Sequence, residues 1–236
     1  LFSNDRLLPA NQELERGIRS AFRDDGVELF GEFLDAVRFP CPEQSAAMER
    51  FLTDRHRGHP LAACVCIGPQ ALEFLSQRRN TLFQGVPVIL AAVTPPQLAS
   101  LPSLEGMAGR PMDWSIRPLL DHLPEIRPQV RRVLVVTGAA EFDAIREKEA
   151  RSQLEPYRDR FQFEYSHGES LPDLKARVAE LPEDTLVFYI SYFKTPDGAT
   201  LVPQDVARDL AAASSVPVVC VYDTYIGTGV LGGPVM

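Results

Sequence analysis

Short runs of β-branched and apolar residues alternate along this chain with segments of helical spacing, and this alternation most constrains its fold. Strands are predicted at residues 1–3, 27–33, 61–67, 86–93, 133–136, 161–165, 185–190 and 216–221. Helices are predicted between them, at residues 9–22, 42–56, 69–79, 116–123, 140–157, 171–180 and 203–213. Such a rhythm predicts α/β architecture with parallel sheets and helices on both faces, because parallel strands need long crossover connections.

Residues 94–115 interrupt the rhythm with prolines at 95, 96, 102 and 111, a further one at 118, and glycines at 106 and 109. We interpret this stretch as the crossover between two α/β units in tandem. The expected boundaries are a first lobe at 1–105, a second lobe at 106–221, and a hinge and return segment toward the first lobe at 222–236.

Composition excludes some partners. The 24 Lys and Arg residues are outnumbered by 32 Asp and Glu, so the net charge is -8 and the basic face needed for nucleic acid is not expected. No apolar run approaches the roughly 20 residues of a transmembrane helix. The chain begins with a strand remnant at Leu1 and stops after a glycine cluster, so we expect a fragment of a longer protein, with membrane contact only through parts outside it.

Sequence motifs for catalysis and for cofactor or metal binding are weak. Residues 227–232 fit G-x-G-x-x-G but lie at the end of the sequence, far from a first strand–helix turn. Neither a phosphate loop, a G-x-S-x-G elbow nor an H-E-x-x-H pair is present, so no cofactor and no metal is expected. The cysteines Cys64 and Cys66 share one face of a predicted strand and are expected to be buried free thiols.

A catalytic pair of carboxylates is a possibility that the positions of some acidic residues allow. Asp113, Glu141 and Asp223 lie at strand ends or in the crossover, where a pair of carboxylates with separated pKa values would be needed. His56 and His59 lie in a charged turn and are expected to be solvated, and His167 ends a strand.

Polar and aromatic residues gather where predicted strands end, which is where open α/β sheets bind ligands. In the first lobe the candidate ligand-binding residues are Ser3, Asn4, Asp5, Gly68 and Thr94. In the second lobe they are Thr137, Gly138, Ser191, Tyr192, Asp223 and Tyr225. Backbone N–H groups at helix starts suit a carboxylate and aromatic rings suit a flat apolar body, so the predicted partner is a small organic ligand, aromatic or carboxylated. Each residue taken singly is also suited to capping a helix or forming a turn.

Basic residues near these strand ends would indicate an anionic ligand, and Arg6 and Arg110 are the nearest candidates; both are equally suited to a solvated position.

Two segments carry a resemblance to a known family. They are Ile190-Ser-Tyr-Phe193 and the closing Tyr222-Asp-Thr-Tyr-Ile-Gly-Thr-Gly-Val-Leu-Gly-Gly233, which follows the strand Val-Pro-Val-Val-Cys-Val. The chain resembles the ABC-transporter substrate-binding proteins that include tryptophan-binding lipoproteins, and most of all the versions fused ahead of bacterial sensor histidine kinases.

The resemblance implies a type I periplasmic-binding-protein-like fold, with two Rossmann-like lobes and a ligand in the cleft between them. It implies an extracytoplasmic sensor domain without enzymatic activity in this fragment, in a membrane-anchored parent, that closes by hinge motion at 94–115 and 222–229. A solute receptor of an ABC importer and an enzyme on a doubly wound sheet are the alternatives. A homodimer is left open.

Overall fold

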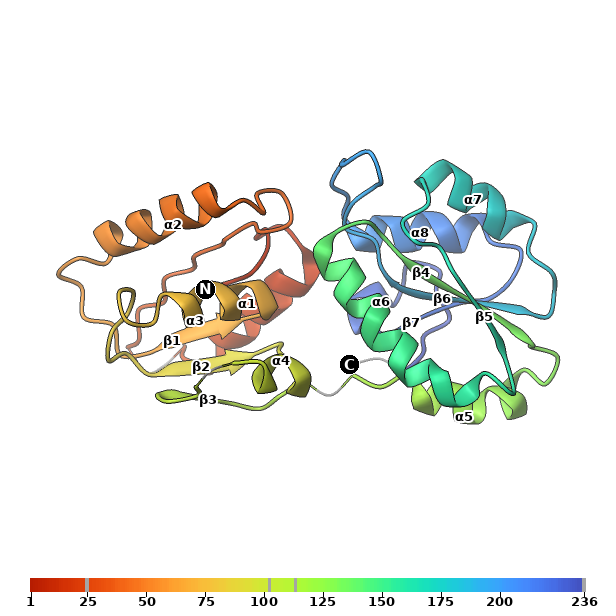
Figure 1. The fold of residues 1–236 in the computed structure, drawn as a ribbon, viewed down its shortest axis with the longest axis horizontal. Helices are drawn as coiled ribbons and strands as arrows, with labels where there is room; N and C mark the ends of the chain where they lie inside the picture. The colour runs from red at the N-terminus through yellow and green to blue at the C-terminus, as the bar shows by residue number, and fades with distance from the viewer. Residues whose placement is uncertain (24–25, 102, 113, 235–236) are drawn as a thin grey trace. The chain divides into compact units, whose positions relative to one another are not determined.

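The computed structural model describes residues 1–23, 26–101, 103–112 and 114–234. The chain divides into unit 1, Leu1–Asp113, and unit 2, Trp114–Met236 (Figure 1). Among the described residues, no helix is long and apolar enough to cross a bilayer.

Unit 1 is built on a parallel sheet with the strand order β1-β2-β3. Its strands are β1 (Cys64–Ile67), β2 (Val88–Ala91) and β3 (Met107–Gly109). Its helices are α1 (Pro9–Ala21), α2 (Pro42–Arg55), α3 (Pro69–Gln77) and α4 (Pro95–Ala99). Each of these helices begins at a proline, whose fixed φ and missing N–H suit the first turn. Phe2 extends the sheet beyond β1 through parallel bridges to Ile67 and Phe33.

The two faces of the unit 1 sheet differ in how they are covered. One face carries Cys64, Cys66, Val88 and Leu90, which are buried against α2 and α3. On the other face Ile89 is 44% exposed, and α1 has no buried residue. A cavity of about 590 Å³ lies there, lined by side chains of α1, of residues 27–32 and of β1 and β2.

Two sequence predictions for unit 1 need correction. Residues 27–33 do not form a strand: only Phe33 pairs, and its ring stacks on Phe2 with centroids 4.5 Å apart, while Val27 and Phe30 remain exposed. Residues 94–115 are more than a connection, because α4 and the edge strand β3 within them belong to unit 1. Pro102 and Asp113 of this stretch lie outside the described residues.

Unit 2 is a three-layer α/β structure around a parallel sheet with the order β5-β4-β6-β7. Its strands are β4 (Arg132–Thr137), β5 (Gln162–Tyr165), β6 (Thr185–Ser191) and β7 (Val218–Cys220). Its helices are α5 (Arg117–Ile126), α6 (Glu141–Leu154), α7 (Leu171–Ala179) and α8 (Pro203–Ala213), with short 3₁₀ turns η1 (Glu155–Tyr157) and η2 (Asp223–Tyr225).

Successive side chains along the strands of unit 2 lie on opposite faces of the sheet, so the hydrophobic core consists of two clusters. Val133 and Val135 of β4 pack with residues of α5 and α6, whereas Leu134 and Val136 pack with residues of α7 and α8. Figure 1 shows α5 and α6 on one side of this sheet and α7 and α8 on the other. Such double-sided burial is why these strands read as continuous apolar runs. The parallel α/β architecture predicted from the sequence is confirmed.

The segment after η2 packs along β7. The backbone N–H of Leu231 donates to the carbonyl of Val218 (2.9 Å), and that of Cys220 donates to the carbonyl of Gly232 (2.8 Å). The described part of 222–236 therefore belongs to unit 2, and its return toward the first lobe stays a prediction.

Candidate functional site

The carboxyl ends of β4 and β6 form the topological switch point of the unit 2 sheet, because strand order reverses direction between them. Four of the predicted site residues lie there: Thr137 and Gly138 at the end of β4, and Ser191 and Tyr192 at the end of β6. The sheet thus brings together residues more than fifty positions apart in the chain, as the sequence predicts.

Asp143, in the first turn of α6, holds these strand ends together. Its Oδ1 accepts a hydrogen bond from Ser191 Oγ (2.6 Å), and its Oδ2 accepts from the backbone N–H groups of Ala140 and Phe193 (both 3.0 Å). The carboxyl is completely buried, and this desolvation raises its pKa to about 6 although the hydrogen bonds act in the opposite direction. Among the described residues this carboxyl contacts hydrogen-bond donors and no base, so we regard it as a structural lock between the strand ends.

Gly138 is required by this lock. A Cβ at this position would lie 2.6 Å from Asp143 Oδ2 and 2.9 Å from the carbonyl oxygen of Lys194. The backbone itself is held by Gly138 N–H donating to Ser191 O (2.9 Å). Gly138 therefore permits close packing at the switch point, and its own N–H is engaged.

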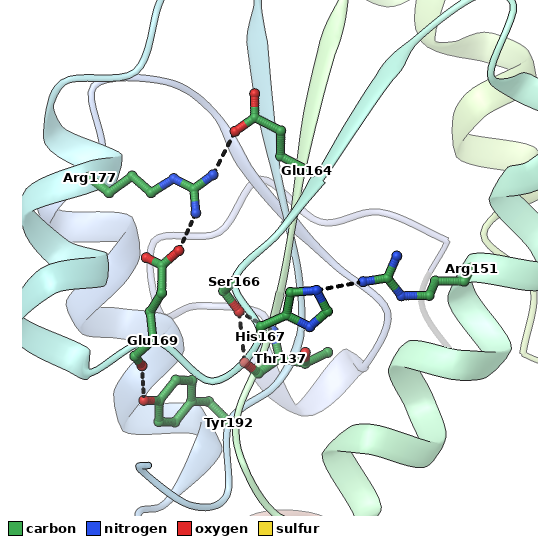
Figure 2. A network of polar contacts seen from close by, with 8 residues as sticks. All are labelled: Thr137, Arg151, Glu164, Ser166, His167, Glu169, Arg177 and Tyr192. Atoms are coloured by element: carbon green, nitrogen blue, oxygen red, sulfur yellow. Dashed lines mark hydrogen bonds and ion pairs between the residues drawn. The ribbon is translucent and has the colours of Figure 1, made fainter.

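Thr137 belongs to a second network, which runs toward the end of β5 (Figure 2). Ser166 Oγ donates to the carbonyl of Thr137 (2.8 Å) and accepts from its N–H (3.0 Å). The Thr137 hydroxyl donates to Glu147 Oε2 (2.7 Å), and Glu147 Oε1 pairs with Arg151 (2.7 Å). Thr137 is fully buried, so the exposed part of this network lies farther out.

His167 is that exposed part, with 71% of its side chain accessible. Its Nδ1 lies 3.3 Å from Glu147 Oε1. Its Nε2 lies 3.0 Å from Arg151 Nη2, the contact drawn in Figure 2. The neutral tautomer with the proton on Nδ1 satisfies both contacts, because it donates to the carboxylate and accepts from the guanidinium. Arg151 also lies over the ring of Tyr165, 3.4 Å from its centroid.

Arg177 and Tyr192 complete the polar contacts in Figure 2. Arg177 pairs with Glu164 (2.6 Å) and with Glu169, and the Tyr192 hydroxyl donates to the Glu169 carbonyl. The Tyr192 ring is completely buried in the core beneath α7 and α8, and this desolvation raises its pKa to about 12. The structure thus uses Tyr192 for packing.

The last strand end, after β7, holds the two remaining predicted residues of unit 2. Tyr225 is 6% exposed and packs edge-on against Tyr189 and Tyr222, with ring centroids 5.3 and 5.5 Å apart. Asp223 is exposed at the start of η2. The Tyr222 hydroxyl is buried and has no hydrogen-bond partner among the described residues.

Arg146 of α6 is a buried charged residue that was not predicted from the sequence. It is 1% exposed, and its guanidinium carbon lies 5.3 Å from the ring centroid of Trp114 and 5.0 Å from that of Phe142. A signal for it exists: the buried residues of α6 follow the inward spacing of a helix, and the first two are charged. They are Asp143, Arg146, Ala150 and Leu154.

In unit 1 the predicted site residues shape the strand-end loops. Ser3 Oγ donates to the carbonyl of Ile67 (3.0 Å) and accepts from the N–H of Ala71 (2.9 Å). Gly68 between them has a φ of +87°, and a Cβ there would lie 2.6 Å from Ser3 Oγ. The close approach of these loops therefore needs glycine at this position.

Thr94 and Asp5 also have local partners. The Thr94 N–H donates to Gln97 Oε1 (2.8 Å) in a capping box at the start of α4. Asp5 Oδ1 accepts from the N–H of Leu7 (2.9 Å), and its other oxygen pairs with Arg38.

Three polar atoms at this edge of unit 1 are buried without a hydrogen-bond partner among the described residues: Asn4 Oδ1, Gln70 Oε1 and Gln97 Nε2. Asn4 follows Phe2, Gln70 lies in the first turn of α3 after β1, and Gln97 lies in α4 after β2. Buried polar atoms are seldom left unpaired in folded proteins, so such a group is typical of a place where a ligand or water completes the hydrogen bonds. Of the three residues, the sequence predicted Asn4.

Other candidates have different outcomes. The His56 side chain is only 8% exposed and lies 3.3 Å from Glu32 Oε1, so the prediction that it is solvated is wrong. Arg6 forms an exposed pair with Glu15 (2.9 Å), and Arg110 is exposed. The predicted buried free thiols of Cys64 and Cys66 are confirmed. Of the candidate acids, Glu141 is exposed and Asp113 lies outside the described residues.

Comparison with known proteins gives neither a matching family model nor a matching curated protein. Solved structures do match. A conserved domain protein from Vibrio cholerae superposes with a TM-score of 0.64 and 16% identity, covering 98% of this chain and 76% of the other. An ABC domain in complex with L-Trp from Streptococcus pneumoniae gives 0.63 and 15%, covering 98% and 75%. A fructose-binding periplasmic domain of a hybrid two-component system gives 0.55 and 10%, covering 94% and 70%.

These likenesses define the fold class. With its two parallel α/β units, the chain has the type I periplasmic-binding-protein fold. Several of the similar structures are named as ligand-binding proteins, among them a leucine-binding protein and the fructose-binding domain of the two-component system.

Proposed function

We propose that this protein is an extracytoplasmic binding domain that recognises a small organic ligand with side chains at the carboxyl ends of its strands, and that it serves as the sensor domain of a histidine kinase. The observation that carries the binding role is the set of buried, unpaired polar atoms at those ends, Asn4 Oδ1, Gln70 Oε1 and Gln97 Nε2. Leaving such atoms unpaired costs about 1–3 kcal/mol each, and a ligand that pairs them recovers this energy.

The chemistry of the strand ends supports binding over catalysis. Asp143 is the described carboxyl whose pKa is raised to about 6, but its contacts are the Ser191 hydroxyl and backbone N–H groups, with no base among them. Reaction chemistry needs a second group whose pKa is separated from the first, and none contacts Asp143 in the described chain.

The test of binding is calorimetric titration of the folded chain with L-tryptophan, L-leucine, myo-inositol and D-fructose. Solved proteins of similar fold have names that include these ligands. Saturable heat with any of them supports the binding role. If a correctly folded sample gives no heat with the whole panel, the proposal is wrong.

A receptor for an ABC importer is the second candidate, supported by the similarity to the L-Trp-bound ABC domain. The two roles differ in what ligand binding does to the parent protein. If the parent is a sensor, its autophosphorylation rate changes when the bound ligand is added to membranes containing it. An unchanged rate, together with ligand uptake that depends on this chain, favours the importer.

A further inference from the structure

Helix α6 places a guanidinium at the carboxyl edge of the unit 2 sheet, close to the last strand end. Arg146 occupies the inward stripe of this helix one turn after Asp143 and is 1% exposed. A buried arginine is kept in a folded protein only when its charge and its N–H groups are matched by nearby acceptors.

Not every N–H group of Arg146 has a hydrogen-bond acceptor among the described residues. Its Nη1 donates to Glu149 Oε2 (2.8 Å), and that oxygen also accepts from Trp114 Nε1 (2.9 Å). The buried Nε of Arg146 has no hydrogen-bond partner among the described residues, and neither does the buried hydroxyl of Tyr222. Tyr222 packs against the hydrophobic cluster that contains Trp114, and Arg146 lies over the Trp114 ring. Burial raises the pKa of Tyr222, and the positive charge of Arg146 works against that rise.

We propose that Arg146 and Tyr222 bind the carboxylate of the ligand, which makes the natural ligand a carboxylic acid such as an amino acid or an aryl acid. This inference rests on the proposed binding role. The Arg146 Nε–H and the neighbouring Nη–H lie in one plane and form the fork that a carboxylate accepts in bidentate fashion. The Tyr222 hydroxyl supplies a further donor.

The charges present make a doubly charged anion less suitable than a singly charged one. Glu149 already offsets the charge of Arg146 at Nη1, so a carboxylate leaves the cluster with one net negative charge and a phosphate would leave more. A neutral polyol has hydroxyl acceptors but does not provide the planar pair of oxygens that suits the fork.

The cluster also contains its own reporter. Because Arg146 is nearly inaccessible, an entering carboxylate must displace part of its cover, and the rings in contact with it are Trp114 and Phe142. Trp114 is the chain's only tryptophan. Carboxylate binding is therefore expected to change the intrinsic tryptophan emission.

The experiment uses matched pairs of probes that differ in the carboxylate: L-leucine against L-leucinol, and 3-phenylpropionate against 3-phenylpropanol. Each is titrated into the whole chain by calorimetry and by Trp114 fluorescence, after the panel above. We expect at least one acid to bind and to shift the emission, and its alcohol to bind about tenfold or more weakly, because the alcohol leaves the buried donors unpaired.

Variants then assign the effect to residues. Tyr222→Phe removes only the hydroxyl and is expected to weaken acid binding about fivefold to tenfold, and Arg146→Lys, which loses the fork, to weaken it more. Lys148→Gln is the control, since it removes an exposed cation from the same helix. Circular dichroism and melting curves establish that each variant is folded, and Tyr222→Phe decides the matter should Arg146→Lys fail to fold.

The outcomes separate the two proposals. If myo-inositol or D-fructose binds while the acids do not, or if acids bind equally well to wild type and Tyr222→Phe, the carboxylate subsite is wrong and the binding role stands. If nothing on either panel binds to the folded chain, both proposals fail.

Discussion

Ser191 and Asp143 are joined by a hydrogen bond of 2.6 Å that links the end of β6 to the first turn of α6. Both side chains are completely buried, and the contact spans 48 residues of sequence. The geometry of the unit 2 switch point therefore depends on one carboxyl that sits inside a protein interior and whose pKa is raised to about 6.

The first prediction concerns pH. Asp143 holds its proton more tightly in the folded chain than in the unfolded one, because its pKa rises from an ordinary value of 3.8 to about 6. Its contribution to the free energy of unfolding is therefore full below about pH 4 and is lost as the pH rises through 6, by as much as ~3 kcal/mol. Urea denaturation at several pH values, followed by Trp114 fluorescence in unit 2, measures this change.

Asp143→Asn is the matched variant for that measurement. Its amide oxygen can accept from Ala140 and Phe193, and its NH₂ can donate to Ser191 Oγ, so the lock is retained without a titrating group. We expect the difference between wild type and variant to change steadily from pH 4 to pH 6. A constant difference over this range would show that Asp143 has an ordinary pKa.

The second prediction concerns Ser191→Ala. This change removes one of the donors to a buried carboxyl, and we expect unit 2 to lose about 1–3 kcal/mol of stability at pH 7. Ser152→Ala is the control, because Ser152 is exposed on α6 and alanine favours the helical state. Equal effects of the two changes in chemical denaturation would contradict the role of the buried hydrogen bond.

The third prediction compares two glycines. Gly138→Ala brings a Cβ within 2.6 Å of Asp143 Oδ2, so we expect a loss of about 1–3 kcal/mol. Gly17→Ala, in the middle of α1 with no atom within 4 Å of the new Cβ, is expected to stabilise the chain by about 0.5–1 kcal/mol. Thermal melting of both variants beside wild type checks the opposite signs. A neutral Gly138→Ala would show that the neighbouring backbone yields to the Cβ.

The fourth prediction concerns the proton on His167. Contacts to Glu147 at Nδ1 and to Arg151 at Nε2 favour the neutral Nδ1–H tautomer. Long-range ¹H–¹⁵N spectra above pH 8 should show a protonated Nδ1 and an unprotonated Nε2. In Glu147→Gln we expect this preference to weaken, because the carboxylate acceptor is gone. An Nε2–H tautomer in the wild-type protein would rule out the described contact.

Much of the unit 2 framework can be read from the sequence, because its strands are buried on both faces. The runs at β4 and β6 are short, apolar and rich in β-branched residues, which favours a buried strand over a helix. The prediction of a strand at residues 27–33 was wrong because this segment is not buried on both faces of a sheet. Their apolar residues cover a cavity and Phe2 instead of pairing along a sheet edge.

The candidate site was harder to predict, since its contacts are non-local. Asp143 and Arg146 look like solvated charges of a polar helix until the strand ends at 191 and 222 are brought against them. Tyr192 and Tyr225 were predicted as ligand contacts from their positions after strands. Position alone does not say on which side of the backbone a ring lies, and both rings are packed in the core.

The uneven cover of the unit 1 sheet has a consequence for how a binding event can be transmitted. Unit 2 is sandwiched between two helical layers, whereas the open face of unit 1 lies under a helix without a single buried residue and beside a cavity of about 590 Å³. Local opening is easiest where few apolar groups are buried. Amide protons of α1 should thus exchange with solvent long before those of β4. We therefore expect the structure of unit 1 to change more readily than that of unit 2 when a ligand binds.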